Sequence, residues 1–177
     1  AVELGGVKQR SVLAILLRSA GRRVSVDVLV DQVWGDGSPG AIRSLRTHIS
    51  NLRRSLGGAV TITGSHGGYV AEAATLWTDV AEVEALMGAA RTASSVAEGY
   101  ESFRRAWAQW RGPVLDGLEG SWADTERTTL DSLQRDCLIG LAEAAVAVDR
   151  APEVIAAVQE AVAADPFDER LAGVLMT

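Results

Sequence analysis

The stretch PGAIRSLRTHISNLRRSL, residues Pro39 to Leu56, decides how the rest of the chain is interpreted. Its apolar residues recur in steps of three and four, which places them in one narrow stripe along a helix. Ser38 can cap the start, Pro39 suits the first helical position, and two glycines follow Leu56. The pattern predicts an amphipathic helix over residues 40–56 that packs one face on a core. The stripe consists of Ile42, Leu45, Ile49, Leu52 and Leu56.

The opposite face of this helix carries arginine, serine, threonine and asparagine and no carboxylate. Helical geometry places there Arg43, Thr47, Ser50, Asn51 and Arg54, with Arg46 and Arg53 on one flank and His48 on the other. These side chains hydrogen-bond base edges and phosphates, and the lack of acids avoids repulsion from a DNA backbone. A solvated surface helix is the alternative, but such helices usually mix both signs of charge. The face therefore favours nucleic-acid binding.

Composition bounds the class of protein. The chain has 177 residues, 47% of them hydrophobic and 23% charged, as in ordinary soluble globular proteins of one large or two small domains. No apolar run approaches the ~20 residues of a membrane span, and no signal peptide is visible. The single cysteine, Cys137, suits a reducing cytoplasm. We expect a cytoplasmic protein without a membrane partner.

No constellation in the sequence indicates catalysis or a bound metal. One cysteine and two histidines are too few for a metal-ligand cluster. No paired carboxylates, Ser/His/Asp set or phosphate-cradling glycine loop is placed to do chemistry. We therefore predict no catalytic residue, no metal, no cofactor and no enzyme activity.

The net charge of −6 hides an asymmetry between the two parts of the chain. Residues 1–77 hold nine Lys and Arg against five Asp and Glu, a balance of +4. Residues 78–177 hold eight against eighteen, a balance of −10, and the two parts together give −6. A basic first part and an acidic second part predict two domains, 1–77 and 78–177, with different partners.

Two helices are predicted before the arginine-rich helix, and a hairpin after it. Helical periodicity covers Lys8 to Ala20 and Val26 to Trp34. The hairpin is predicted from β-branched Val60 to Thr63, a glycine-rich turn over residues 64–68 and a return strand from Tyr69. Three helices with a hairpin after the third define a winged helix-turn-helix, whose third helix enters the major groove.

Strings along this first part resemble a known family. SVDVLVDQVWGDGSP (residues 25–39), RSLRTHISNLRRSLG (residues 43–57) and GGYV (residues 67–70) are similar to winged-helix domains of the response-regulator type. Together with LGGVKQRSVLAILLRSAGRRVS, they are most similar to the Streptomyces antibiotic regulatory protein family of bacterial transcription activators. The resemblance spans Leu4 to Tyr69.

The resemblance implies a sequence-specific activator that binds double-stranded promoter DNA and recruits RNA polymerase, including its sigma subunit. The small positive charge of the first part predicts modest DNA affinity for one copy. We therefore expect a homodimer on repeated half-sites.

The resemblance also assigns roles to single residues of the predicted helix. Arg43 and His48 match positions that grip phosphates, and Arg53 matches a basic position that reaches the backbone. For His48 the alternative is a structural packing role. Positions that face the floor of the major groove are matched by Thr47, Ser50, Asn51 and Arg54. The helix surface predicted to bind DNA also includes Ser44 and Arg46.

The wing departs from many relatives, which insert an arginine from its tip into the minor groove. Here the tip reads Ser65-His66-Gly67-Gly68. We therefore expect His66 and Gly67 to touch phosphate only, and a plain exposed turn is the alternative for His66.

The loop from Gly35 to Pro39 has a second candidate role. In similar activators the loop between the second and third helices helps to engage RNA polymerase, which assigns that contact to Asp36 and Ser38. The alternative is a simple helix connector.

From Thr78 onward the sequence is helical almost throughout. Capping signals and apolar spacing predict helices over residues 79–90, 96–110, 121–149 and 152–164, with another starting at Asp168. Antiparallel pairs with a proline at a turn favour tetratricopeptide-like stacking, although the repeat period is poor. The strings WAQWRGPVLDGL and ADPFDERLAGVLM resemble the bacterial transcriptional activation domain that follows the winged helix in the same family.

An aromatic stripe crosses the second part at Tyr100, Phe103, Trp107 and Trp110. Such a stripe could border a ligand pocket, but core packing is the expected role. The acidic residues of this part are expected on solvated helix faces.

The sequence at both ends of the chain leads us to expect further contacts or further segments. Ala1 to Gly6 is too short for the sheet that usually precedes the first helix in such domains, so we expect an upstream segment. The chain stops at Thr177 within a predicted helix, so we expect truncation there or self-association.

The overall prediction is a mainly α chain. A winged helix-turn-helix, with three helices and a β-hairpin wing, is followed by an all-α tetratricopeptide-like domain. The alternative function is a helical protein-interaction scaffold whose winged helix binds an acidic protein partner through the arginine face. Salt-sensitive binding to duplex DNA with a preference for one sequence would discriminate against this scaffold.

Overall fold

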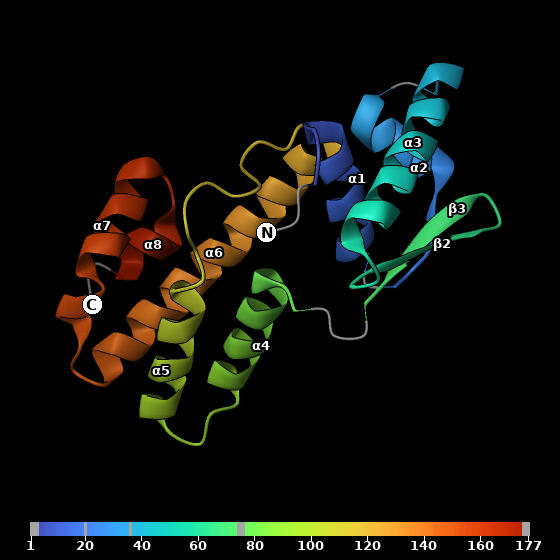
Figure 1. The fold of residues 1–177 in the computed structure, drawn as a ribbon. Coiled ribbons are helices and arrows are strands. Elements are labelled where there is room, and N and C mark those ends of the chain that lie inside the picture. Colours follow the sequence, from blue (N-terminus) through green and yellow to red (C-terminus); the bar gives the residue numbers. More distant parts are fainter. Residues whose placement is uncertain (1–3, 20, 36, 74–76, 175–177) are drawn as a thin grey trace. The chain divides into compact units, whose positions relative to one another are not determined.

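The computed structural model describes residues 4–19, 21–35, 37–73 and 77–174 (Figure 1). These residues are mainly helical with one small antiparallel sheet, which confirms a winged helix-turn-helix followed by a helical domain. They divide into two compact units: residues 1–76 with 114–128, and residues 77–113 with 129–177.

The first unit contains the winged helix, with α1 to α3 next to the β2–β3 hairpin (Figure 1). Its elements are α1 (Val7–Arg18), β1 (Val24–Ser25), α2 (Val26–Trp34), α3 (Pro39–Leu56), β2 (Thr61–Ser65) and β3 (Gly68–Glu72). The three predicted helices are confirmed with small shifts at their ends. The predicted turn over residues 64–68 was too long, because cross-strand pairing continues to Ser65 and Gly68.

The sheet holds a third strand that the sequence pattern does not predict. Its order is β1-β3-β2, and β1 pairs Val24 with Tyr69 and Ser25 with Gly68, antiparallel. A strand of two residues is too short to show the alternation from which strands are predicted. Gly68 is required where the strands meet, because a Cβ there would lie 2.5 Å from the Val24 carbonyl oxygen.

Buried apolar residues from α1, α2, α3 and the sheet form the core of this unit. On α3 the predicted stripe supplies Leu45, Ile49 and Leu52, which are fully buried, while Ile42 and Leu56 are partly buried at its edge. Burial of each such side chain contributes about 1.5–3 kcal/mol. The stripe therefore fixes which face of α3 points outward.

A segment from the acidic half, residues 114–128, packs in the first unit. Arg18 of α1 pairs with Glu126 at 2.6 Å. Gly120 passes so close to α2 that a Cβ would lie 2.6 Å from the Gln32 carbonyl oxygen. From the sequence we predicted that this segment belongs to the second domain. Helical periodicity could not indicate its packing in the first unit, because periodicity carries no information about contacts between distant residues.

Helices alone make up the second unit within the described part of the chain. They are α4 (Asp79–Arg91), α5 (Val96–Trp107), most of α6 (Ser121–Ala147), a 3₁₀ turn (Ala151–Glu153), α7 (Ile155–Ala164) and α8 (Glu169–Val174). α4 and α5 lie side by side (Figure 1). The prediction of one helix over 152–164 was wrong at its start, because Ala151–Glu153 form a 3₁₀ turn and α7 begins at Ile155.

Two hydrophobic clusters hold the second unit together. Tyr100 of the aromatic stripe is buried, and Phe103, Trp107 and Trp110 pack partly buried against the clusters. The expected core role of the stripe is confirmed, although Trp107 also borders a pocket. Cys137 lies in the same core, where burial raises its pKa to about 11.

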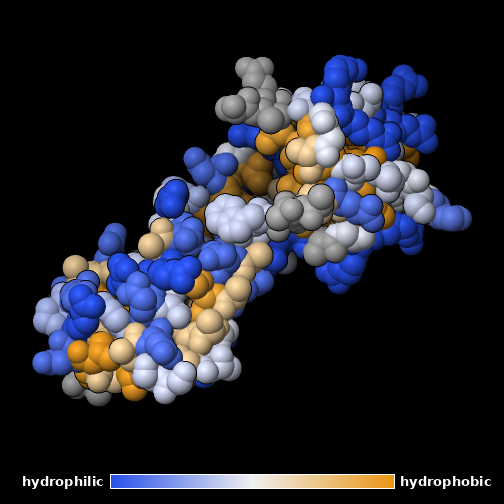
Figure 2. Space-filling view, turned by 60° about the horizontal axis from the view of Figure 1, so that its bottom comes forward, coloured by the Kyte–Doolittle hydropathy of each residue, from blue (hydrophilic) through white to orange (hydrophobic). Residues whose placement is uncertain are grey.

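Figure 2 shows one face of the molecule, on which hydrophilic residues are interspersed with smaller hydrophobic areas. Within the described residues, no helix combines the length and the apolarity that a bilayer crossing requires.

Candidate nucleic-acid interface

The α3 helix is the element that the sequence selects, and both of its ends are fixed by local chemistry. The Ser38 hydroxyl accepts a hydrogen bond from the Ala41 backbone N–H at 3.2 Å, and Pro39 occupies the first turn. Gly57 closes the helix in a left-handed conformation that suits glycine. With its inner face held by the core, α3 presents a defined outer face.

The outer face of α3 is basic and carries no acid. Exposed residues on it are Arg43, Arg46, Thr47, Ser50, Arg53 and Arg54. Among the described residues, the guanidinium groups of Arg43, Arg46 and Arg54 have neither an ion pair nor a hydrogen-bond partner. These three cations can bind a ligand without first breaking an internal pair.

Arg53 differs from the other exposed arginines of α3, because it is tied to the wing. Its Nε donates to the Ile62 carbonyl oxygen on β2 at 2.8 Å. Arg53 therefore links the helix to the hairpin, and part of its guanidinium is committed within the protein. The remaining N–H groups of its side chain keep a phosphate contact possible.

Two residues predicted to contact DNA lean toward α1 instead of pointing straight outward. His48 Nδ1 lies 3.2 Å and Asn51 Nδ2 lies 3.5 Å from the Oε1 atom of Gln9. Gln9 is buried, with 5% of its surface exposed, and His48 and Asn51 are half-buried. Sequence reasoning missed Gln9, because a single polar residue in a helix gives no sign of being buried.

The His48 ring is held on several sides. It stacks on Trp34 with ring centroids 5.8 Å apart, and the Lys8 ammonium lies 5.3 Å from the centroid of the same Trp34 ring. Burial lowers the pKa of His48, and the nearby Lys8 charge lowers it further. Because Gln9 Oε1 can only accept, Nδ1 of His48 must carry the proton, and the neutral ring leaves Nε2 as an acceptor.

The wing tip is a tight two-residue turn at His66 and Gly67. Both residues have positive φ, 37° and 77°, which is typical of the type I′ turns that join antiparallel strands. The Arg23 guanidinium donates to the His66 carbonyl oxygen at 3.0 Å, and the Val26 N–H donates to Gly67 at 2.9 Å. The tip is therefore braced by the segment before α2. In the sequence, Arg23 is one of two adjacent arginines, and nothing there predicts its contact with His66.

The remaining predicted positions have simpler surroundings. Ser44 is half-buried on α3, and the exposed Thr47 hydroxyl donates back to the Arg43 carbonyl oxygen at 3.1 Å. Ser38 serves as the helix cap described above. Asp36, the other residue predicted to engage RNA polymerase, lies outside the described residues.

Two family descriptions match the chain. Residues 3–71 match "Transcriptional regulatory protein, C terminal" and residues 78–177 match "Bacterial transcriptional activator domain". A winged helix joined to this helical domain defines a class of bacterial transcription regulators. Within that class, the chain belongs to the Streptomyces antibiotic regulatory protein family of transcription activators, as its sequence strings predict.

Named relatives are similar over nearly the whole chain. Regulatory protein AfsR of Streptomyces coelicolor is 32% identical over 97% of this chain and 18% of its own length. Transcriptional regulatory protein EmbR of Mycobacterium tuberculosis is 32% identical over 99% of this chain and 48% of its own length. The solved structure of EmbR in complex with a low affinity phosphopeptide matches with a TM-score of 0.82 at 30% identity, covering 98% of this chain and 48% of that one. The chain thus spans about half or less of these relatives.

Proposed function

We propose that the protein is a sequence-specific transcription activator that binds double-stranded promoter DNA and recruits RNA polymerase, including its sigma subunit. The α3 helix enters the major groove, and the β2–β3 hairpin lies against the adjacent backbone. Two copies bind repeated half-sites as a homodimer, and the protein acts in the cytoplasm. Asp36 and Ser38 are the candidates for the polymerase contact.

The observation that carries this proposal is the acid-free face of α3, where three guanidinium groups have no partner among the described residues. Arg43, Arg46 and Arg54 are exposed on a helix whose ends and inner face are fixed. Phosphates and the O6 and N7 atoms of guanine are the ligands that such groups recognise in DNA.

The net charge of the first unit is too small to attract DNA, so the proposed binding depends on the local charges of the α3 face. The first unit as it packs, residues 1–76 with 114–128, holds ten Lys and Arg against nine Asp and Glu, a balance of only +1. A unit with so little net charge binds DNA through local cations rather than through a general field. Weak binding by one copy is the reason that we propose two copies on repeated half-sites.

The roles that we propose divide α3 along its length. Arg43, near the helix start, holds phosphate, while Thr47, Ser50, Asn51 and Arg54 face the groove floor. Arg46 and Arg53 reach the backbone from the flank, with Arg53 also bracing the hairpin. At the wing, His66 and Gly67 touch phosphate.

Selection of bound duplexes from a random library, repeated at two salt concentrations, tests the proposal. We expect tandem short repeats to be recovered, and to be lost when Asn51→Ala and Arg54→Ala are combined. Arg111→Ala is the matched control, since Arg111 is an exposed arginine of the second unit without a partner among the described residues. Equal recovery of every duplex would contradict sequence-specific binding.

A second candidate function uses the same face. The arginine side chains of α3 could bind an acidic protein partner, and the related EmbR has been solved with a phosphopeptide. Binding of an acidic peptide that competes with duplex DNA, in a protein with no preferred DNA sequence, would favour this scaffold role over the activator.

A further inference from the structure

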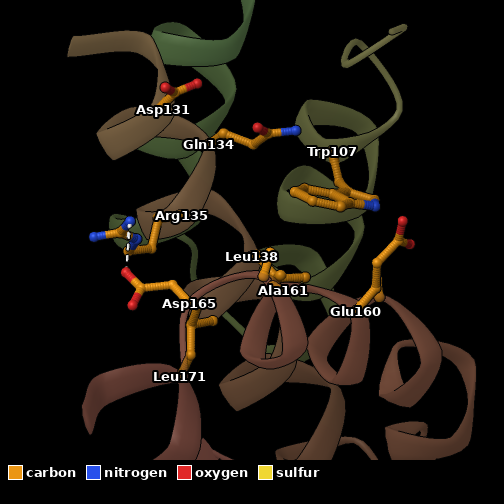
Figure 3. A pocket seen from close by; sticks show the side chains of 11 residues that line it. Trp107, Asp131, Gln134, Arg135, Leu138, Glu160, Ala161, Asp165 and Leu171 are labelled. Atoms are coloured by element: carbon orange, nitrogen blue, oxygen red, sulfur yellow. Dashed lines mark ion pairs between the residues drawn. The ribbon is translucent and has the colours of Figure 1, made fainter. Parts of the chain in front are cut away.

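A pocket of about 480 Å³ opens in the second unit (Figure 3). It lies between α6 and α7, with Trp107 of α5 at one end and Leu171 of α8 at the other side. The floor is apolar, formed by Leu138, Ala161 and neighbouring small residues. Its volume is within the range of about 300–1,000 Å³ that is typical of ligand sites.

The pocket extends along α6 for about two turns. Asp131, Gln134, Arg135 and Leu138 line it at positions i, i+3, i+4 and i+7 of this helix. At 1.5 Å per residue, these positions span about 10 Å. About three residues of extended polypeptide, at roughly 3.3 Å each, match this length.

The charges around the pocket do not balance. Among the described residues that line it, Arg135 is the single cation, and it is already paired, at 2.9 Å with Asp168 and at 3.5 Å with Asp165. The carboxylates of Asp131 and Glu160 have no hydrogen bond or ion pair with any described residue. The pocket therefore presents two uncompensated negative charges, one on each of the helices that form its walls.

An aromatic ring stands beside these carboxylates. In Figure 3 the Glu160 carboxylate and the Gln134 amide both point toward the Trp107 ring. Trp107 is fixed, because part of its ring packs against both hydrophobic clusters of the unit. A fixed tryptophan next to a free carboxylate is an arrangement that binds a Lys or Arg side chain, through cation–π attraction and charge pairing.

We propose that this pocket binds a basic peptide segment of a partner protein. A Lys or Arg side chain of the peptide lies on Trp107 beside Glu160, and a second pairs with Asp131. An aliphatic side chain between them packs on Leu138 and Ala161. This function is independent of DNA binding by α3, and the pocket has the wrong charge for a phosphopeptide.

Fluorescence anisotropy of the full chain with two labelled peptides tests this site. The first probe is a peptide of about twelve residues that repeats Leu-Ala-Arg-Lys, and the second carries Glu in place of every Arg and Lys. We expect the basic peptide to bind and the acidic one not to bind. Combining Glu160→Gln with Asp131→Asn should weaken binding of the basic peptide about tenfold, and Trp107→Phe should weaken it severalfold.

Glu143→Gln is the matched control, because Glu143 is an exposed carboxylate of α6 outside the pocket and without a partner among the described residues. The proposal is overturned if Glu143→Gln weakens binding as much as the pocket variants, or if both peptides bind equally. Binding of N-acetyl-arginine amide as tight as that of the peptide would overturn a peptide ligand in favour of a small cation. Concentration-dependent self-association that Glu160→Gln abolishes would overturn a separate partner in favour of a second copy of this chain.

Discussion

The exposed arginines of α3 and five arginines of the second unit are used in opposite ways. On α3 of the first unit, Arg43, Arg46 and Arg54 are exposed and unpartnered among the described residues. In the second unit, five arginines pair with carboxylates of their own unit. They are Arg104, Arg105, Arg135, Arg150 and Arg170.

This difference indicates that a ligand-binding surface is recognised by arginines that lack a carboxylate partner, rather than by the number of its arginines. Exposed ion pairs contribute only about 0–1 kcal/mol to stability, so those of the second unit say little about function. An arginine that has no carboxylate within reach keeps its charge for a ligand. The acid-free composition of α3 is what leaves its guanidinium groups available.

The largest effect is expected from adding an acid to α3. Thr47→Glu places a carboxylate one turn after Arg43, a spacing at which opposite charges pair along a helix. Because this carboxylate engages Arg43 and also repels phosphate, we expect affinity for the selected duplex to fall about 100-fold, or about 2.8 kcal/mol. Titration of the duplex measures the change. Ala97→Glu, at an exposed position of α5, is the control. If the DNA affinity of Thr47→Glu were unchanged, the proposed binding of DNA by α3 would be refuted.

The next effect concerns the acidic segment that packs with the first unit. Gly120 has φ +107°, and a Cβ there would meet the Gln32 carbonyl oxygen at 2.6 Å. Since both the backbone strain and the close contact oppose a side chain, we expect Gly120→Ala to lower the free energy of unfolding by about 2 kcal/mol. Denaturant unfolding provides the measurement.

Gly117→Ala offers a matched control in the same loop. Gly117 also has positive φ, +69°, but its Cβ would meet only the flexible end of Arg10 at 3.5 Å. We expect the loss of stability in Gly117→Ala to be about half that in Gly120→Ala. Equal losses would mean that strain alone matters, and that the segment does not rest tightly on α2.

A smaller effect distinguishes two arginines on the same face. Arg54→Ala should cost about 1–3 kcal/mol on the selected duplex and relax the preference at one base pair. Arg43→Ala should weaken binding to all sequences alike and reduce the slope of affinity against salt by about one. Competition between specific and random duplexes measures both. Identical behaviour of the two variants would overturn the proposed division between base and phosphate contacts.

The periodic elements of the fold could be predicted, and the reason is visible on α3. Its cap at Ser38, its buried stripe and its terminal glycine are all local signals, and each has the structure that the sequence indicates. The third strand and the packing of residues 114–128 could not be predicted, because both depend on contacts between distant residues.

The candidate site shows the same limit. A helical wheel places residues on a face but does not describe what the neighbouring helix offers to them. Asn51 falls on the outer face of the wheel, yet its amide reaches toward Gln9 of α1. Arg53 falls on the flank, yet its Nε is bound to the Ile62 carbonyl. Both contacts are made with other elements, Gln9 on α1 and Ile62 on β2.

His48 gives the smallest expected effect, and it decides between the DNA contact and the packing role. Its pKa is lowered from the ordinary 6.5 by burial and by Lys8, so the unfolded chain takes up a proton at a higher pH than the folded chain. The stability that neutral His48 contributes is therefore complete above pH 6.5 and is lost as the pH falls below 6.5 through the lowered pKa. We expect the midpoint of thermal unfolding to fall slightly more in the wild type than in His48→Gln over this window.

The DNA affinity should behave differently over the same pH window. If Gln9 holds the Nδ1 proton of His48, the neutral ring has no donor for phosphate, and affinity should be independent of pH. Titrations in a His66→Gln background remove the only other histidine of the chain from the comparison. An affinity that climbs as the pH falls, and that His48→Gln makes flat, would show that His48 binds phosphate as a cation. The packing of His48 against Trp34 would then have to loosen when DNA binds, because the ring would need to turn its Nε2 proton outward.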